Sequence, residues 1–193
     1  MKLFFVTHNI HKFSEAQAVA AEYGFDLEWF SFEYEEIQHD DLETIAYDSC
    51  KKLVGLPDLK GKRFFLEDAG LFIRSLRGFP GPFSSYVFKT IGNDGILKLM
   101  NGFIDRSAFF MSVIAYYDLN TISLFKGITE GSITLQKRGS MGFGFDPIFT
   151  PYDATVNGLN QTYAEMSLET KNLYSHRQKS LRKLFTTLKR LRP

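Results

Sequence analysis

The chain of 193 residues contains one cysteine and one tryptophan, and it has no long hydrophobic run. The single cysteine, Cys50, excludes an internal disulfide framework and any zinc site built from several cysteines. No segment approaches the ~18 apolar residues of a membrane span, and the apolar run near the first residue is too short for a signal peptide. We therefore expect a soluble, cytoplasmic protein with no membrane partner.

Net charge is also nearly absent. The chain has 23 Lys and Arg against 22 Asp and Glu, for a net charge of +1, so nothing in the overall balance suggests a protein that wraps a nucleic acid. Local charge is segregated: no Lys or Arg lies between Lys12 and Lys51, and no Asp or Glu follows Glu169. These runs are either solvated helix faces or the two walls of a cleft that holds a divalent cation and a phosphate.

The residues that are abundant indicate a globular α/β protein. Hydrophobic residues make up 44% of the chain and aromatic residues 16%, with twenty Phe, and the length suits one large domain or two closely packed lobes. Hydrophobic patterns predict helices after Asn9, at about 42–53, around Ile96 and at the C-terminal end, where leucines and Phe185 recur at helical spacing. The same patterns predict strands at residues 2–6, 26–32, 63–66, 108–117 and 121–129, which together indicate a mixed sheet.

Glu67 and Asp68 directly follow the predicted buried strand at residues 63–66, which is expected to end there. Two carboxylates at such a place need a cation, a hydrogen-bond network or solvent, and strand ends are where α/β proteins place ligand sites. Oxygen ligands select Mg²⁺, Mn²⁺ or Ca²⁺. Four earlier carboxylates offer a further oxygen ligand: Glu35, Glu36, Asp40 and Asp41.

Between the first predicted strand and the first helix stand six residues that suit a helix cap and a phosphate site: Thr7, His8, Asn9, Ile10, His11 and Lys12. Backbone N–H groups at a helix N-terminus, together with a hydroxyl, an amide and a lysine, form a plausible phosphate cradle. It is not a Walker A loop, because the glycines are missing. No third ligand stands near His8 and His11, so we interpret them as turn and helix-face residues.

Two later segments are candidate ligand sites. Residues 142–147, GFGFDP, alternate glycines with aromatics and end in a carboxylate, so that backbone and ring can approach a planar ligand; a hairpin that caps the core is the alternative. The sequence Ser175-His176-Arg177 opens the last helix, with Lys171 one to two turns before it, and helix capping by Ser175 is the alternative explanation of this segment.

Taken in order, these motifs resemble the inosine triphosphate pyrophosphatase family, also called Ham1-like. The family pattern T-x-N-x-x-K is matched by Thr7, Asn9 and Lys12. Five further motifs match along the chain: EDAGL at 67–71, G-x-P-G-x-x-S at 78–84, F-G-F-D-P-I-F at 143–149, T-Y-A-E-M at 162–166 and K-x-x-x-S-H-R at 171–177.

The resemblance implies an α/β fold with an elongated mixed β-sheet flanked by helices, in one domain (residues 1–193) of two lobes with a central active-site cleft, usually as a homodimer. It implies Mg²⁺-dependent hydrolysis of ITP, dITP and XTP to the monophosphate and pyrophosphate, which sanitises the nucleotide pool. The alternatives are a Maf-like pyrophosphatase acting on other nucleotides and a non-catalytic nucleotide- or RNA-binding protein.

The resemblance also implies roles for single residues. Asp68 would accept the proton of the attacking water, and Glu36 and Asp68 would serve the Mg²⁺ site. Lys51, with Lys52 as the alternative, would contact phosphate together with residues 7–12. The remaining substrate contacts would be Ala69, Phe143, Gly144, Phe145, Asp146, Lys171, His176 and Arg177. Two of these depart from the common family residue: Ala69 stands where most members have serine, and Phe145 where tyrosine is commoner.

Base choice is expected to depend on hydrogen bonding. Hypoxanthine and xanthine present a 6-oxo acceptor where adenine presents a 6-amino donor. A donor such as Arg177 or a backbone N–H aimed at that position would be left unpaired by adenine, which disfavours ATP.

Overall fold

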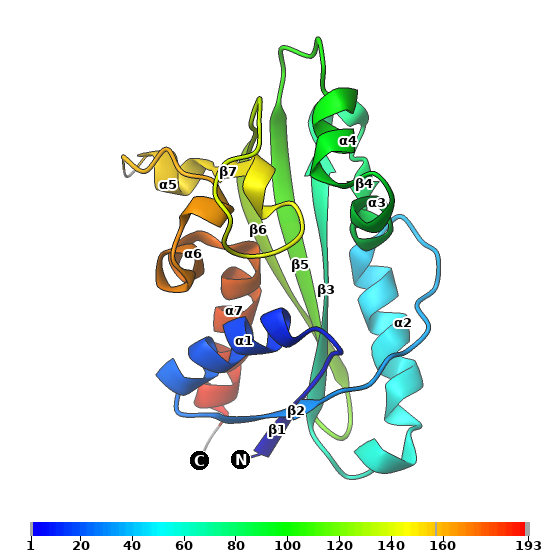
Figure 1. Cartoon of the computed structure of the whole chain (residues 1–193). Coiled ribbons are helices and arrows are strands. Elements are labelled where there is room, and N and C mark those ends of the chain that lie inside the picture. Colours follow the sequence, from blue (N-terminus) through cyan, green and yellow to red (C-terminus); the bar gives the residue numbers. More distant parts are fainter. Residues whose placement is uncertain (1, 157, 192–193) are drawn as a thin grey trace. The chain divides into compact units, whose positions relative to one another are not determined.

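The computed structural model describes residues 2–156 and 158–191, and helices flank a mixed β-sheet in it (Figure 1). The predicted α/β class is thereby confirmed. The strands are β1 (Lys2–Val6), β2 (Asp26–Phe30), β3 (Phe64–Ile73), β4 (Pro80–Gly81), β5 (Ser107–Tyr117), β6 (Ile122–Ile133) and β7 (Phe149–Pro151). The α-helices are α1 (Ile10–Glu22), α2 (Leu42–Val54), α3 (Ser84–Thr90), α4 (Gly92–Leu99), α5 (Tyr152–Val156), α6 (Leu168–Tyr174) and α7 (His176–Arg190). None of the helices in the described residues is long and apolar enough to cross a membrane.

The chain forms two compact units. Unit 1 comprises Met1–Asp68, Ser112–Gly127 and Arg177–Pro193, and unit 2 comprises Ala69–Met111 and Ile128–His176. In unit 1 the strand order is β2-β1-β3-β5-β6, and β1 runs parallel to both of its neighbours. In unit 2 the order is β3-β5-β6-β7, with β4 antiparallel to β3 and β7 antiparallel to β6.

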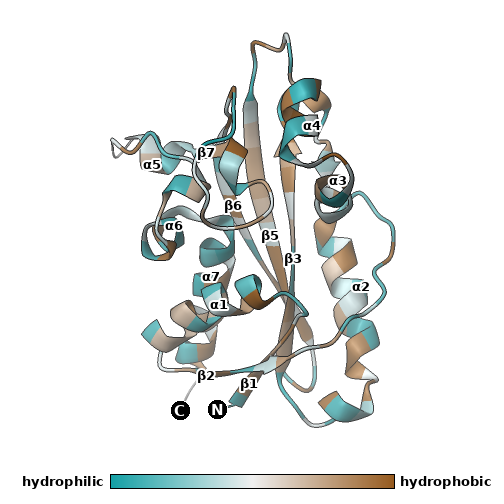
Figure 2. Cartoon of the chain, viewed as in Figure 1, coloured by the Kyte–Doolittle hydropathy of each residue, from teal (hydrophilic) through white to brown (hydrophobic). Residues whose placement is uncertain are grey.

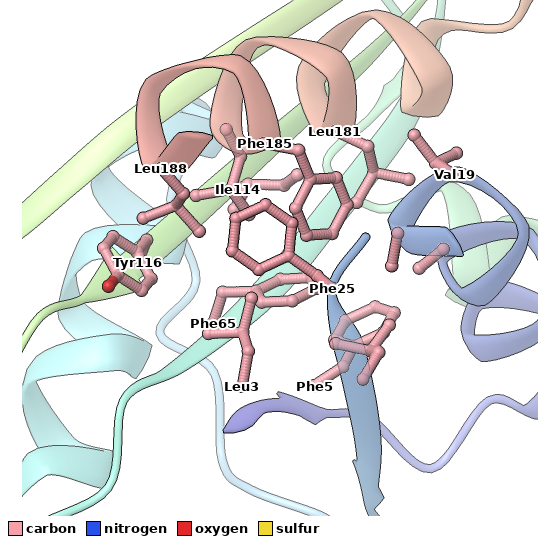
Figure 3. Packing of buried hydrophobic residues seen from close by; sticks show 14 of the residues in the cluster. Leu3, Phe5, Val19, Phe25, Phe65, Ile114, Tyr116, Leu181, Phe185 and Leu188 are labelled. Atoms are coloured by element: carbon pink, nitrogen blue, oxygen red, sulfur yellow. The ribbon is translucent and has the colours of Figure 1, made fainter. Parts of the chain in front are cut away.

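The core of unit 1 lies between the sheet and the helix pair α1 and α7, whereas α2 covers the opposite face (Figure 1). Figure 2 shows β3 and β5 as largely hydrophobic along their length. Phe185 of α7 points into this core toward the strands (Figure 3), with its ring centre 5.3 Å from that of Phe25 and 6.4 Å from that of Phe65. Aromatic rings from three separate segments therefore meet in one buried cluster.

Unit 2 has a core of its own, which is also rich in aromatic side chains. Phe110 of β5 packs edge-on against Phe149 at 4.8 Å between ring centres, and Phe149 lies 5.2 Å from Tyr163. Ile96 of α4 and Met100, the C-cap residue of that helix, are fully buried in the same cluster. The helical pattern predicted around Ile96 is thus confirmed as α4.

The prediction that the third strand ends at Glu67 is wrong. Strand β3 continues to Ile73, so Glu67 and Asp68 lie within it. The strand continues because Leu71 and Phe72 pair with β4. Gly70 permits the close approach, since a Cβ there would lie 2.4 Å from the carbonyl oxygen of Gly81.

Other element boundaries shift by smaller amounts. Strand β2 ends at Phe30 rather than at residue 32, and β6 extends to Ile133 rather than to residue 129. Strand β4 and helix α3 were not predicted from the sequence. The seven residues of α3 are too few to show a helical repeat in the sequence.

We expect Phe185→Ala to lower the free energy of unfolding by about 3–5 kcal/mol, because it removes a large ring from a packed core. Lys189→Ala, on an exposed position of the same helix, should change it by less than about 0.5 kcal/mol. Urea denaturation of both variants checks this. Equal stability of the two variants would contradict the packing described.

Candidate active site

The turn between β1 and α1 is organised by its own polar side chains. Asn9 caps α1, as predicted, with Oδ1 accepting from the backbone N–H of His11 (2.9 Å) and of Lys12 (3.2 Å). Thr7 Oγ1 accepts from the backbone N–H of Asn9 at 3.1 Å. The side chains of His8, Ile10 and His11 are exposed. The turn thus has a fixed shape and an open surface, but Asn9 already occupies two of the helix N–H groups.

Lys12 connects this turn to β3. Its Nζ donates to the carbonyl oxygen of Glu67 at 2.9 Å and lies 3.0 Å from Glu67 Oε2. The side chain of Lys12 is partly exposed, whereas that of Glu67 is fully buried. The ammonium group of Lys12 is therefore held by the buried carboxylate of Glu67, the residue that precedes Asp68, and it keeps some contact with solvent.

Glu67 is the centre of a larger buried network in unit 1. Its Oε1 accepts from Ser112 Oγ at 2.7 Å and lies 3.2 Å from Arg177 Nε. Arg177 Nη1 also forms an ion pair with Glu15, and both side chains are almost completely buried. The network combines two carboxylates with two cations, Lys12 and Arg177, so that its formal charges cancel.

Arg177 is held in its charged form by this network. Burial by itself would lower the pKa of Arg177, but the carboxylates of Glu67 and Glu15 outweigh it and raise the pKa above its ordinary value. The base contact predicted for Arg177 stays a prediction. Its ion pairs are a second role, which the sequence reasoning missed.

Glu15 is the charged residue of this network that the sequence did not reveal. It lies on α1 beside Phe13 and Ala16, which belong to the apolar face of the helix, and only 4% of it is exposed. An acidic residue on an apolar helix face needs a buried cation. That mismatch was the available signal, but it does not reveal that the partner is Arg177.

Asp68 and Glu36 both influence one tyrosine, Tyr34. Burial raises the pKa of Tyr34, and the negative charges of Glu36, Asp68 and Glu67 raise it further. Asp68 is half-buried and Glu36 is exposed. Within residues 2–156 and 158–191 no group of three or more His, Cys, Asp or Glu side chains could hold a metal ion. Two carboxylates nevertheless fit Mg²⁺, which typically takes one or two of them together with phosphate oxygens.

Lys51 lies on α2 and lines a groove of about 390 Å³. Among the residues that line this groove, only Lys51 is a predicted substrate contact. The lining residues are Ile37, Asp41, Glu43, Thr44, Tyr47, Asp48, Lys51 and Leu124. The alternative, Lys52, forms an ion pair with Asp48 at 2.8 Å. The phosphate contact of either lysine stays a prediction.

In unit 2, a second buried ion pair organises the loop that contains Phe143 and Asp146. Asp146 Oδ2 accepts from Lys171 Nζ and from the backbone N–H of Phe143, both at 2.8 Å. Lys171 Nζ also lies over the ring of Phe143, 4.9 Å from its centre, and 5.6 Å from the ring centre of Tyr163. Lys171 thus interacts with one carboxylate and with two aromatic rings.

The other predicted substrate contacts of unit 2 differ in exposure. His176 is buried and stacks on Phe110, with ring centres 4.6 Å apart. Phe145 is also buried and packs edge-on against Phe88 at 5.4 Å, so its ring is part of the core. Phe143, Gly144 and Ala69 are half-buried. Of the two loop aromatics, Phe143 is therefore the more exposed.

Known proteins match this chain over nearly its whole length. The model of the Ham1 family matches residues 3–187. A curated relative, the dITP/XTP pyrophosphatase of Pyrococcus horikoshii, is 46% identical over 192 residues, which cover 98% of this chain and 97% of that protein. The dITP/XTP pyrophosphatase of Thermococcus kodakarensis is 46% identical over 189 residues and 98% of each chain. Among solved structures, a HAM1 protein from Coxiella burnetii has a TM-score of 0.83 at 27% identity, over 98% of this chain and 99% of that one.

We expect Arg177→Gln to lower the free energy of unfolding by about 3–5 kcal/mol, because it leaves buried carboxylates uncompensated. Combined with Glu15→Gln, the total loss should be smaller than the sum of the two single losses by about 1–3 kcal/mol. Urea denaturation of the two single variants and the double variant measures this coupling.

The matched control for this cycle is the exposed pair Arg182 and Glu22, whose nitrogen and oxygen are 2.8 Å apart. Its coupling should be no more than about 1 kcal/mol. Strict additivity at Glu15 and Arg177 would show that their ion pair does not stabilise the fold.

Proposed function

Because the chain belongs to the Ham1 family, we propose that it hydrolyses dITP, XTP and ITP to the nucleoside monophosphate and pyrophosphate. The observation that carries the proposal is the 46% identity to two dITP/XTP pyrophosphatases over almost the full length of each. The motif residues Thr7, Asn9, Lys12 and Asp68 are present. Removing triphosphates of deaminated purines keeps these bases out of nucleic acids.

The reaction needs a water molecule to attack the α-phosphorus. The new bond joins the water oxygen to phosphorus, and the bond from phosphorus to the bridging oxygen breaks, so that pyrophosphate leaves. We assign the proton of the water to a carboxylate oxygen of Asp68. The chain supports this assignment, because Glu67, the neighbouring residue in β3, is fixed by Lys12, Ser112 and Arg177. The backbone on one side of Asp68 is thereby held in position.

The negative charge on the triphosphate must be balanced by cations and N–H groups. We assign phosphate binding to residues 7–12, where Lys12 is partly exposed and held by Glu67. Glu36 and Asp68 would hold Mg²⁺, which when bound supplies charge neutralisation on the phosphate oxygens. Lys51 is proposed as a further phosphate contact.

Base selection is assigned to the loop of Phe143 and Asp146, together with Lys171, His176 and Arg177. Phe143 offers a partly exposed ring for stacking. Lys171 and Asp146 offer a donor and an acceptor that are already fixed by their ion pair. A fixed donor favours the 6-oxo group of hypoxanthine and xanthine over the 6-amino group of adenine.

We also propose that the protein acts in the cytoplasm and as a homodimer. Support for self-association comes from aromatic side chains on the surface of unit 2, where Phe79, Phe83 and Tyr86 are 39%, 45% and 70% exposed. Clusters of exposed apolar side chains of this kind are typical of protein interfaces.

Pyrophosphate release from ITP, dITP, XTP, ATP, GTP and the pyrimidine triphosphates, each with Mg²⁺ and with excess EDTA, tests the proposed function. We expect kcat/KM for the deaminated purines to exceed that for ATP and GTP by at least about 10²-fold, and chelation to abolish turnover. A preference for pyrimidine nucleotides would instead support the Maf-like alternative. Binding of nucleotide without any turnover would support a non-catalytic protein.

We expect Asp68→Asn to lower kcat by at least about 10²-fold, because the amide keeps the shape of the carboxylate but cannot accept the proton. Circular dichroism should show an intact fold. Asp58→Asn, in the short helix Pro57–Leu59, removes a carboxylate from the same unit and serves as the control. If Asp68→Asn retains wild-type turnover, the proton acceptor is another residue.

A further inference from the structure

Trp29, the only tryptophan of the chain, lies in β2 and contacts the turn assigned to phosphate. Its indole Nε1–H donates to the carbonyl oxygen of Thr7 at 2.6 Å. We propose that Trp29 is a positioning residue that fixes the orientation of this turn, and that its fluorescence reports occupancy of the turn by a polyphosphate. The proposal rests on the proposed function, because it takes residues 7–12 as the phosphate site.

Trp29 is itself held in place by a second contact. Its ring stacks on Phe13 of α1, with ring centres 5.6 Å apart and planes inclined by 22°. The indole is 42% exposed, so one part of the ring faces solvent while the N–H is used inside the chain. Trp29 therefore joins three elements, β2, the turn and the first turns of α1.

The hydrogen bond from Trp29 to Thr7 fixes the orientation of the peptide unit between Thr7 and His8. A peptide unit is planar and trans, so the carbonyl of Thr7 and the N–H of His8 point in opposite directions from one plane. When the indole holds the carbonyl oxygen on the β2 side, the orientation of the His8 N–H is set as well. The backbone N–H of Thr7 also donates to the carbonyl oxygen of Phe30 at 3.2 Å. Strand β2 thus determines how the turn presents its donors.

The replacement that isolates this contact is Trp29→Phe, which keeps a ring against Phe13 and removes the N–H donor. We expect the inhibition constant of pyrophosphate and the KM for ITP each to rise about three- to tenfold, the effect of one lost hydrogen bond. kcat should change less than about twofold, since ground state and transition state lose the same binding. Inhibition by inosine, which has no phosphate, should be unchanged.

Glu28→Gln is the matched control. Glu28 is the neighbouring residue of β2 and pairs with Lys2 near the surface, away from the turn residues. This variant should have wild-type inhibition constants for pyrophosphate and inosine. Unchanged pyrophosphate inhibition in Trp29→Phe would overturn the proposal, and so would an equal weakening of pyrophosphate and inosine, because that indicates a general disturbance of the fold.

A direct measurement separates this inference from the proposed function. Pyrophosphate with Mg²⁺, added to the wild-type protein, should change the intensity or the wavelength of tryptophan emission, because one side chain produces the whole signal. Calorimetric binding of pyrophosphate should weaken by the same factor as its inhibition in Trp29→Phe. A protein that binds pyrophosphate but hydrolyses no deaminated purine triphosphate would refute the function and leave this inference standing. Saturating pyrophosphate without any change in emission would contradict the inference alone.

Discussion

The neutralisation of one buried carboxylate is the constraint on which the first unit depends. Glu67 lies inside β3 with its side chain fully buried, and a charge in that position is tolerable only with cations at hydrogen-bonding distance. Arg177 and Lys12 supply them, and Glu15 balances the second cation. The charges that stabilise this part of the fold also hold Lys12 in place within the phosphate segment, residues 7–12. Stability and positioning of the site therefore have one physical origin.

The second unit also contains a buried carboxylate, and a lysine neutralises it. Asp146 and Lys171 are both almost completely buried, and the aromatic rings of Phe143 and Tyr163 surround the lysine. The ion pair and the hydrogen bond from Phe143 to Asp146 fix the conformation of the glycine-rich loop. Without them the loop would sample many conformations, because glycine restrains the backbone little. In both units, a charge that is costly to bury specifies the conformation of residues assigned to the substrate.

Much of the fold was predictable from local patterns, and most of the charged network was not. The apolar repeat of the last helix and the cap at Asn9 are local signals, and both appear in the structure as expected. The length of β3 was not predictable, because Glu67 and Asp68 interrupt the apolar run that normally marks a buried strand. Their compensation comes from residues distant in sequence. Motif order placed Arg177 and Lys171 near the substrate, but only three-dimensional geometry reveals that each is paired with a buried acid.

The long sequence separation within the charged network has a consequence for synthesis on the ribosome. Glu15 and Arg177 are 162 positions apart, so a growing chain contains Glu15, Glu67 and Lys12 well before the guanidinium that balances the second carboxylate exists. Until α7 emerges, these carboxylates are more stable in water than in a dry core. We therefore expect the first unit to reach its final packing only when the last helix brings its arginine and its apolar face together.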